Sequence, residues 1–128
     1  MRKMKKGRKF GRERSQRKAL KRSFSANFIL KEKIKTTEAK AKEFSSFIER
    51  QITKSCKIAE IQVSDGKESS KILCLKKSMF KDFSPAVVKK LIEVIVPKCK
   101  GRKGGWTRIT KLGPRKSDGS KMAIIEFV

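Results

Sequence analysis

The stretch of this sequence best suited to chemistry is a short basic loop, Gly101-Arg-Lys-Gly-Gly-Trp-Thr-Arg108. Glycines allow a backbone to approach a phosphate closely, because they carry no Cβ. Arg102, Lys103 and Arg108 supply positive charge. Trp106 offers a plane on which a nucleobase could stack, and its alternative role is to fill the protein core. The loop therefore predicts noncovalent binding of nucleic acid.

No set of residues has the composition of a catalytic or metal site. Histidine is absent, which removes the commonest general base and the commonest metal ligand. Cys56, Cys74 and Cys99 are widely spaced and form no Cys-x-x-Cys pair, so neither a zinc site nor a disulfide framework is indicated. The sequence also lacks a nucleophile elbow and a Walker-type loop. We therefore predict no enzymatic activity, no catalytic residue, no cofactor and no small-molecule substrate.

Charge is the dominant feature of the composition. The 128 residues include 36 Lys and Arg against 12 Asp and Glu, for a net charge of +24. Such a charge repels itself, so a dense polyanion is the expected partner, and nucleic acid ranks first. An anionic membrane ranks second, but the basic segments lack the apolar faces of interfacial helices. No apolar run approaches the about 20 residues of a membrane span, so we predict no membrane insertion.

A second concentration of positive charge lies at the N-terminus. Residues 1–13 are predicted to form an extended arm that orders along phosphates on binding, the alternative being a solvated tail. Phe10, the one large apolar group of this arm, could stack on a base or pack against protein. The residues predicted to contact RNA are Arg2, Lys3, Lys5, Lys6, Arg8, Lys9, Phe10, Arg12, Arg14, Arg17, Lys18, Lys21, Arg22, Lys35, Arg102, Lys103, Trp106, Arg108, Arg115 and Lys116.

The elements that position these residues meet at residues 33–43. Ile34 and Thr36 alternate with their neighbours, which predicts a brief strand. Beyond it, apolar residues recur at spacings of three and four, which predicts a helix running to about Cys56. Thr37 lies at the change of period, where its hydroxyl could cap the first helical turn.

Three more helices are predicted along the chain. The first runs from Ser15, its expected N-cap, to about Leu30, with a basic N-terminal half and an apolar C-terminal half. A short one covers residues 72–79. The last begins at Ser84-Pro85, a capping hydroxyl followed by proline, and Pro97 is expected to end or kink it.

Two strands are predicted at the C-terminal end, over residues 106–112 and 121–128. Residues 113–120 should join them as a hairpin loop longer than a two-residue turn. The last strand is apolar on both faces, so it should be central or covered. The predicted class is α+β in two layers, a small three-stranded sheet packed by about four helices, with residues 14–128 as a single domain. The residues predicted to be buried are Phe24, Phe28, Phe44, Ile48, Leu91, Ile95, Ile124 and Ile125.

Taken in order, several segments resemble one family closely: bacterial large-subunit ribosomal protein number seventeen. The resemblance covers nearly the whole chain, and its specificity comes from the ordered set of segments and from their spacing. The matching segments are Met1-Arg2, Gly7-Arg-Lys-Phe-Gly-Arg12, Arg17-Lys-Ala-Leu20, Ile34-Lys-Thr-Thr37, Lys40-Ala-Lys-Glu43, Gly104-Gly-Trp-Thr-Arg-Ile109, Gly113-Pro-Arg115 and Met122-Ala-Ile-Ile-Glu-Phe-Val128.

The resemblance implies a structural constituent of the large ribosomal subunit. Such a protein would bind large-subunit rRNA near the exit of the peptide tunnel, beside neighbouring ribosomal proteins, in the bacterial cytoplasm. It also implies an α+β fold without enzymatic activity or cofactor. The alternative function is that of a free-standing nucleic-acid binder that compacts a chromosome.

Overall fold

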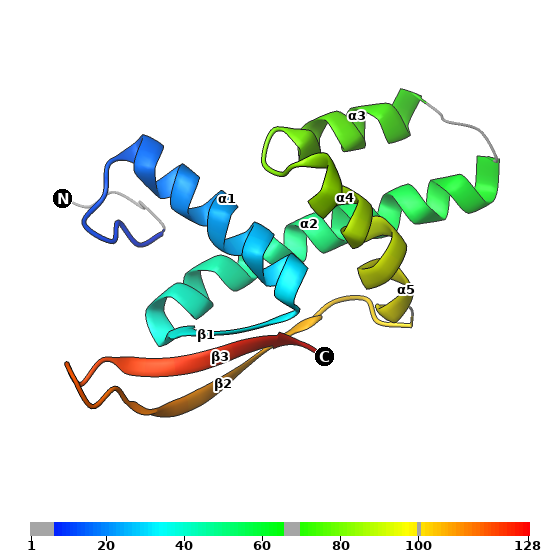
Figure 1. The fold of residues 1–128 in the computed structure, drawn as a ribbon. Helices are drawn as coiled ribbons and strands as arrows, with labels where there is room; N and C mark the ends of the chain where they lie inside the picture. Colours follow the sequence, from blue (N-terminus) through cyan, green and yellow to red (C-terminus); the bar gives the residue numbers. More distant parts are fainter. Residues whose placement is uncertain (1–6, 66–69, 100) are drawn as a thin grey trace.

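A computed structural model describes residues 7–65, 70–99 and 101–128 of the chain (Figure 1). The π-helical turn Leu91–Ile95 joins α4 (Pro85–Lys90) to α5 (Val96–Lys98), so that the two helices form one rod. The predicted α+β class is confirmed, because the helices pack against a three-stranded sheet. In chain order the elements are α1 (Arg14–Lys31), β1 (Lys33–Thr37), α2 (Glu38–Asp65), α3 (Ser70–Phe80), α4 (Pro85–Lys90), α5 (Val96–Lys98), β2 (Thr107–Pro114) and β3 (Lys121–Phe127).

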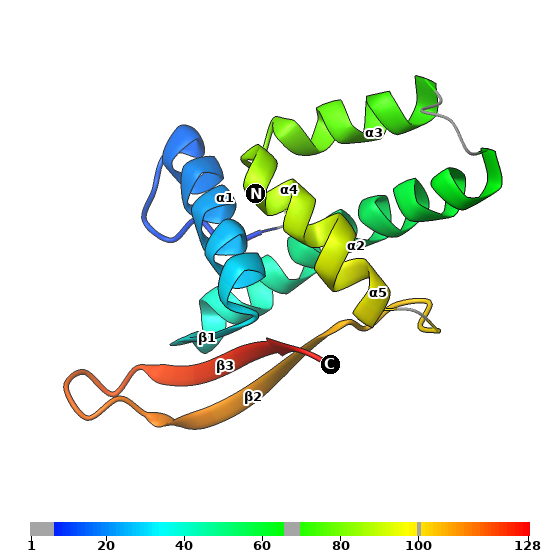
Figure 2. The same ribbon diagram turned by 45° about the vertical axis from the view of Figure 1, so that its right-hand side comes forward.

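The sheet is antiparallel with the strand order β1-β3-β2, so the last strand is central, as its apolar sequence predicted. The helices all lie on one side of it in both views (Figures 1 and 2). Ile125 faces them and is fully buried, whereas Ile124, predicted to be buried, is only half-buried. That prediction was wrong because successive strand residues face opposite sides, and no described helix covers the side of Ile124.

The core is built on one stripe of α2. Ala41, Phe44, Ile48 and Ile52 recur at helical spacing and are at most 2% exposed. The remaining predicted core residues are confirmed as buried, except Phe24, which is half-buried against this cluster. The stripe holds the first helix, the sheet and the rod of α4 and α5 around α2.

The helix α2 is longer than predicted. The sequence indicated an end near Cys56, but the helix continues to Asp65. Its second half forms a hairpin with α3 that projects away from the sheet (Figures 1 and 2). Ile58 is fully buried there with Ile72 of α3, which the sequence pattern predicted to be helical. Burial against α3 therefore extends α2 through a stretch whose own periodicity is weak.

Two predicted helix starts differ in their outcome. Pro85 is the first residue of α4, and Ser84 is its N-cap, as predicted, although the Ser84 hydroxyl makes no capping hydrogen bond. Ser15 was wrong as an N-cap, because α1 begins at Arg14 and Glu13, two residues before Ser15, occupies the N-cap position. The Glu13 side chain does not cap the helix either, so the first turn of α1 leaves its N–H groups to another acceptor.

Pro97 alters the helix without ending it. It lacks an N–H and its ring crowds the carbonyl of the preceding turn. The turn from Leu91 to Ile95 widens accordingly, and the N–H of Val96 donates to the carbonyl of Leu91, five residues back. The rod then continues through Lys98, so the proline marks a local bulge.

Glu32 ties the end of α1 to the rod of α4 and α5. Its backbone is left-handed, with φ of 62°, which lets the chain turn from α1 into β1. Its carboxylate lies 2.7 Å from the Nζ of Lys98 and 3.2 Å from the Nζ of Lys90. The hydrogen bond from Lys98 is the main cause that holds the pKa of Glu32 below its ordinary value; burial opposes it, and the hydrogen bond from Lys90 adds to the lowering.

Glu32→Gln should lower the melting temperature at pH 7 by about 1–4 °C, because it removes two ion pairs that are partly exposed. A carboxyl with a depressed folded pKa stabilises the protein above its unfolded pKa of about 4.3, and that stability is lost as the pH falls through the lower folded pKa. The difference between variant and wild type should therefore shrink between about pH 5 and pH 3. Thermal melts across this range test it. Glu93→Gln is the control, since Glu93 is exposed and has no ion pair among the described residues.

Candidate nucleic-acid interface

A hollow with basic walls lies where residues 7–10 meet α1 and α2. Its volume is about 400 Å³, and six of its lining residues are Lys or Arg. We call it the basic hollow. Its lining residues are Gly7, Arg8, Lys9, Phe10, Arg14, Arg17, Lys18, Lys21, Glu43 and Phe44.

Aromatic packing fixes the chain that forms this hollow. The Phe10 ring centroid lies 5.8 Å from that of Phe44, which in turn lies 4.8 Å from that of Phe24. Phe10 and Gly11 both have positive φ, so the chain turns sharply and returns to α1. A Cβ at Gly7 would come within 3.2 Å of a Glu43 carboxylate oxygen, which favours glycine there. Of the two roles predicted for Phe10, the structure supports packing against protein.

The positive charge of the basic hollow is largely unpaired. Arg8, Lys9 and Lys18 are exposed and make no ion pair with any described residue. The guanidinium of Arg17 donates to the carbonyl of Arg12 at 2.6 Å, which orients it along the entrance of α1. Glu43 is the one carboxylate of the lining. The hollow can therefore accept an anion such as a phosphate.

Arg22, and Lys21 of the basic hollow, have partners inside the protein. The Arg22 guanidinium lies 2.9 Å from the carboxylate of Asp82, which precedes α4. The Lys21 ammonium lies 4.8 Å from the ring centroid of Phe47. Sequence reasoning considered only neighbours on the same helix, so it could not find these contacts between distant segments.

A second basic surface is the side of the sheet that the helices leave uncovered. Residues paired across the strands share one side, and the register aligns Lys33 with Glu126 and Arg108. Lys33 pairs with Glu126 at 3.0 Å, but Arg108 is exposed without an ion pair among the described residues. Lys35, opposite Ile124, is likewise exposed and unpaired. We call this surface the outer sheet face.

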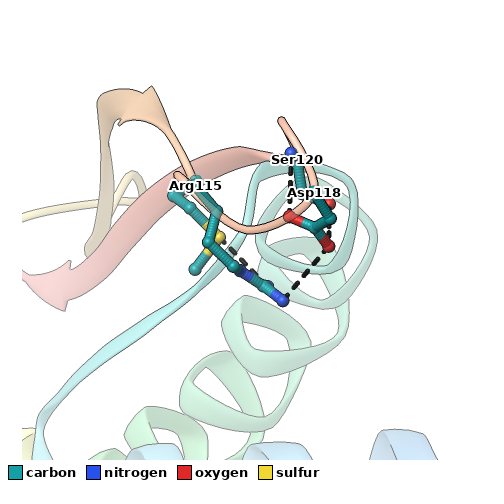
Figure 3. A network of polar contacts seen from close by, with 4 residues as sticks. Arg115, Asp118 and Ser120 are labelled. Carbon is teal, nitrogen blue, oxygen red and sulfur yellow. Dashed lines mark hydrogen bonds and ion pairs between the residues drawn. The ribbon is translucent and has the colours of Figure 1, made fainter.

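The hairpin between β2 and β3 extends the outer sheet face. Asp118 accepts hydrogen bonds from the Ser120 hydroxyl at 2.8 Å and the Ser120 N–H at 3.1 Å, which lower the pKa of its carboxyl (Figure 3). The Arg115 guanidinium lies 3.4 Å from Asp118 and 3.3 Å from the Met122 sulfur. Lys116 is exposed beside it. Lys35, Arg115 and Lys116 line one hollow of about 610 Å³, so the register brings these predicted contact residues together.

The glycine-rich loop, residues 101–108, forms a third basic surface. Arg102 and Lys103 are exposed, as an RNA contact requires. Trp106 is only 6% exposed and belongs to the core, so of its two predicted roles the structure supports filling the core. Lys57, which sequence reasoning missed, lines a hollow with Arg102 and Lys103. A prediction of the full length of α2 would have included Lys57 in this helix.

The predicted contact residues thus fall into separate surfaces. Arg2, Lys3, Lys5 and Lys6 lie outside the described residues.

Within the described ranges, no three His, Cys, Asp or Glu side chains gather as a metal site would require. No helix there has the length and apolarity to cross a membrane. The three cysteines are free thiols.

Comparison with known proteins identifies the protein family of this chain. A sequence model described as ribosomal protein L17 matches residues 20–128, which include the core, the outer sheet face and the glycine-rich loop. The chain belongs to the ribosomal protein L17 family. Membership confirms the expected function class, a structural ribosomal protein and not an enzyme.

Individual relatives resemble the chain over most of its length. The large ribosomal subunit protein bL17 of Chlorobium phaeobacteroides is 41% identical over 128 residues, covering 100% of this chain and 70% of the relative. Its counterpart from Caldanaerobacter subterraneus is 40% identical over 121 residues, covering 94% of this chain and 97% of the relative. The counterpart from Sorangium cellulosum is 37% identical, covering 100% of this chain and 83% of the relative.

Proposed function

We propose that this ribosomal protein is a structural constituent of the bacterial large subunit, and that it binds large-subunit rRNA through phosphates. The basic hollow carries the proposal. Its cations come from residues 8–9 and from α1, and the packing of Phe10 and of Phe24 on the same ring, Phe44 of α2, holds these two segments together. Unpaired cations on an already folded main chain suit a polyanion, because binding then has to order their side chains but not the backbone that carries them.

The other basic surfaces extend the proposed rRNA interface. Arg108 and Lys35 on the outer sheet face, and Lys116 on the hairpin, are exposed cations. Arg102 and Lys103 add charge at the glycine-rich loop. Surfaces spread around a small core suit a protein that fills gaps between RNA segments. We place it, as the family resemblance implies, near the tunnel exit beside neighbouring ribosomal proteins in the cytoplasm.

Crosslinking of the protein to rRNA, with identification of the attached peptides, tests this interface. Attached peptides should come from residues 7–22, from the glycine-rich loop and from residues 108–116. Crosslinks confined to the hairpin of α2 and α3 would contradict the proposal. Co-sedimentation with large subunits through a high-salt wash separates a ribosomal constituent from a free-standing chromosome-compacting protein, which the wash should release.

Arg108→Ala should weaken binding to an rRNA fragment and leave the melting temperature of the free protein nearly unchanged. Arg108 is exposed and makes no ion pair among the described residues, since Glu126 opposite it pairs with Lys33, so its charge contributes little to folding. Loss of one phosphate contact should reduce the slope of log affinity against log salt by about one. Arg50→Ala is the matched control, because Arg50 is exposed on α2 outside the three basic surfaces. Equal loss of affinity in both variants would show that only net charge matters.

A further inference from the structure

A hollow of about 630 Å³ lies between α2, the end of α5 and the glycine-rich loop. Its size is within the range of small-ligand sites, about 300–1,000 Å³. The walls are mainly apolar: Cys56 and Ala59 come from α2, Val96 from α5, and Cys99 and Trp106 from the segments that follow. Burial raises the pKa of both thiols, so these walls are neutral at pH 7.

The entrance of this hollow is cationic. Lys57, Arg102 and Lys103 line it and are exposed, and none has an ion pair among the described residues. Glu60 is the one carboxylate of the lining, and it lies close enough to Cys56 to raise the pKa of that thiol further. An apolar floor beneath such an entrance suits a ligand with a flat apolar part and an attached anion.

The backbone of the loop leaves room for such a ligand. Gly101 and Gly105 have φ of 88° and 67°, which other residues rarely adopt. A Cβ at Gly101, Gly104 or Gly105 would meet nothing within 4 Å, so the main chain of the loop is open to approach at each of these glycines. A phosphate can therefore approach the main chain beside Arg102.

We propose that this hollow receives one unpaired nucleotide of RNA, its base against the apolar wall and its phosphate against Arg102 and Lys103. We call the hollow the nucleotide pocket; the proposal rests on the proposed rRNA binding and adds a mode of contact to it. A peptide side chain could also fill an apolar hollow, but three unpaired cations against one carboxylate favour the polyanion. Unpaired bases are what proteins most often bind individually in folded RNA.

The fluorescence of Trp106 reports on binding at the pocket, because Trp106 is the only tryptophan and the chain has no tyrosine. The full chain is titrated with an oligoadenylate of about six nucleotides while the Trp106 emission is recorded. We expect a saturable change in emission. Ala59→Phe, which fills the pocket without changing charge, should weaken this binding by about 5- to 100-fold, the range for stacking of one base. Arg102→Gln should reduce the salt slope by about 0.7.

The cysteines provide a second readout with an internal control. Cys56 lines the pocket, whereas Cys74 is exposed on α3 outside it. Alkylation followed by peptide mass spectrometry should show that bound oligoadenylate protects Cys56 and leaves Cys74 reactive. Circular dichroism and thermal melting establish that Ala59→Phe remains folded.

The outcomes separate this proposal from the proposed function. Unchanged Trp106 emission and unprotected Cys56, with an rRNA fragment still bound, would overturn the nucleotide pocket alone. Failure of the wild-type chain to bind the rRNA fragment would overturn the proposed function. Protection of Cys56 in intact large subunits but not by RNA alone would assign the pocket to a neighbouring protein, and would also overturn the proposal.

Discussion

Phe44→Ala should lower the free energy of unfolding by about 3–5 kcal/mol, a large part of the stability of a domain of this size. Phe44 is 2% exposed and packs between the rings of Phe10 and Phe24. Its truncation removes buried apolar area and leaves a cavity that the rigid helix cannot close. Denaturant titration followed by circular dichroism measures the loss.

Phe80→Ala is the matched control for this prediction. Phe80 is 47% exposed at the end of α3, so the same chemical change there should cost about 0.5 kcal/mol or less. Phe44→Ala should also weaken rRNA binding at temperatures where the variant is folded, because Phe10 loses the surface that holds the basic hollow. Equal stability losses at both positions would contradict this assignment of the core.

Raising the salt concentration from about 50 to about 200 mM should reduce the affinity for an rRNA fragment by about three to five decades, as expected for six to ten phosphate contacts. The net charge of +24 and the unpaired cations of the three surfaces motivate this value. Each contact releases counterions from the RNA, and added salt opposes that release. Filter binding or fluorescence anisotropy at several salt concentrations measures the slope.

A triple variant separates the basic hollow from the overall charge. Replacement of Arg14, Arg17 and Lys18 by Gln should reduce the salt slope by about two to three. The same number of replacements at Lys71, Lys76 and Lys77 on α3, away from the three surfaces, is the control. A wild-type affinity that hardly changes with salt would contradict binding through phosphates.

The strands and the main core were predictable because their residues repeat with a clear period. Ile34 and Thr36 marked β1, and the α2 stripe marked its helix. The end of α2 was not predictable, because contact with α3 stabilises that part of the helix, and the local sequence there lacks a clear helical period. Ile124 was misjudged because the sequence indicates an apolar residue but not which side of the sheet is covered.

The candidate site was predictable as a distribution of charge and not as geometry. Sequence reasoning chose the arginines and lysines, but the pairing of Arg22 with Asp82 depends on how distant segments meet. The burial of Trp106 depends likewise on β2 meeting α2, a helix far from it in the sequence. Lys57 was missed because its helix was predicted to end just before it. Tertiary contacts, which leave no local pattern, decided each of these cases.

The strand order also constrains the time at which this protein can finish folding. β3 holds every interstrand hydrogen bond of the sheet, yet it follows both of its neighbours in the chain. During synthesis β1 and β2 emerge before β3, so neither has the strand with which it pairs. Pairings so distant in sequence, such as Lys33 with Glu126, carry a high loop-closure cost and form slowly. The nascent chain therefore presents its helices, and the charge of α1, before its sheet exists, and RNA could engage that helix while the outer sheet face is still unformed.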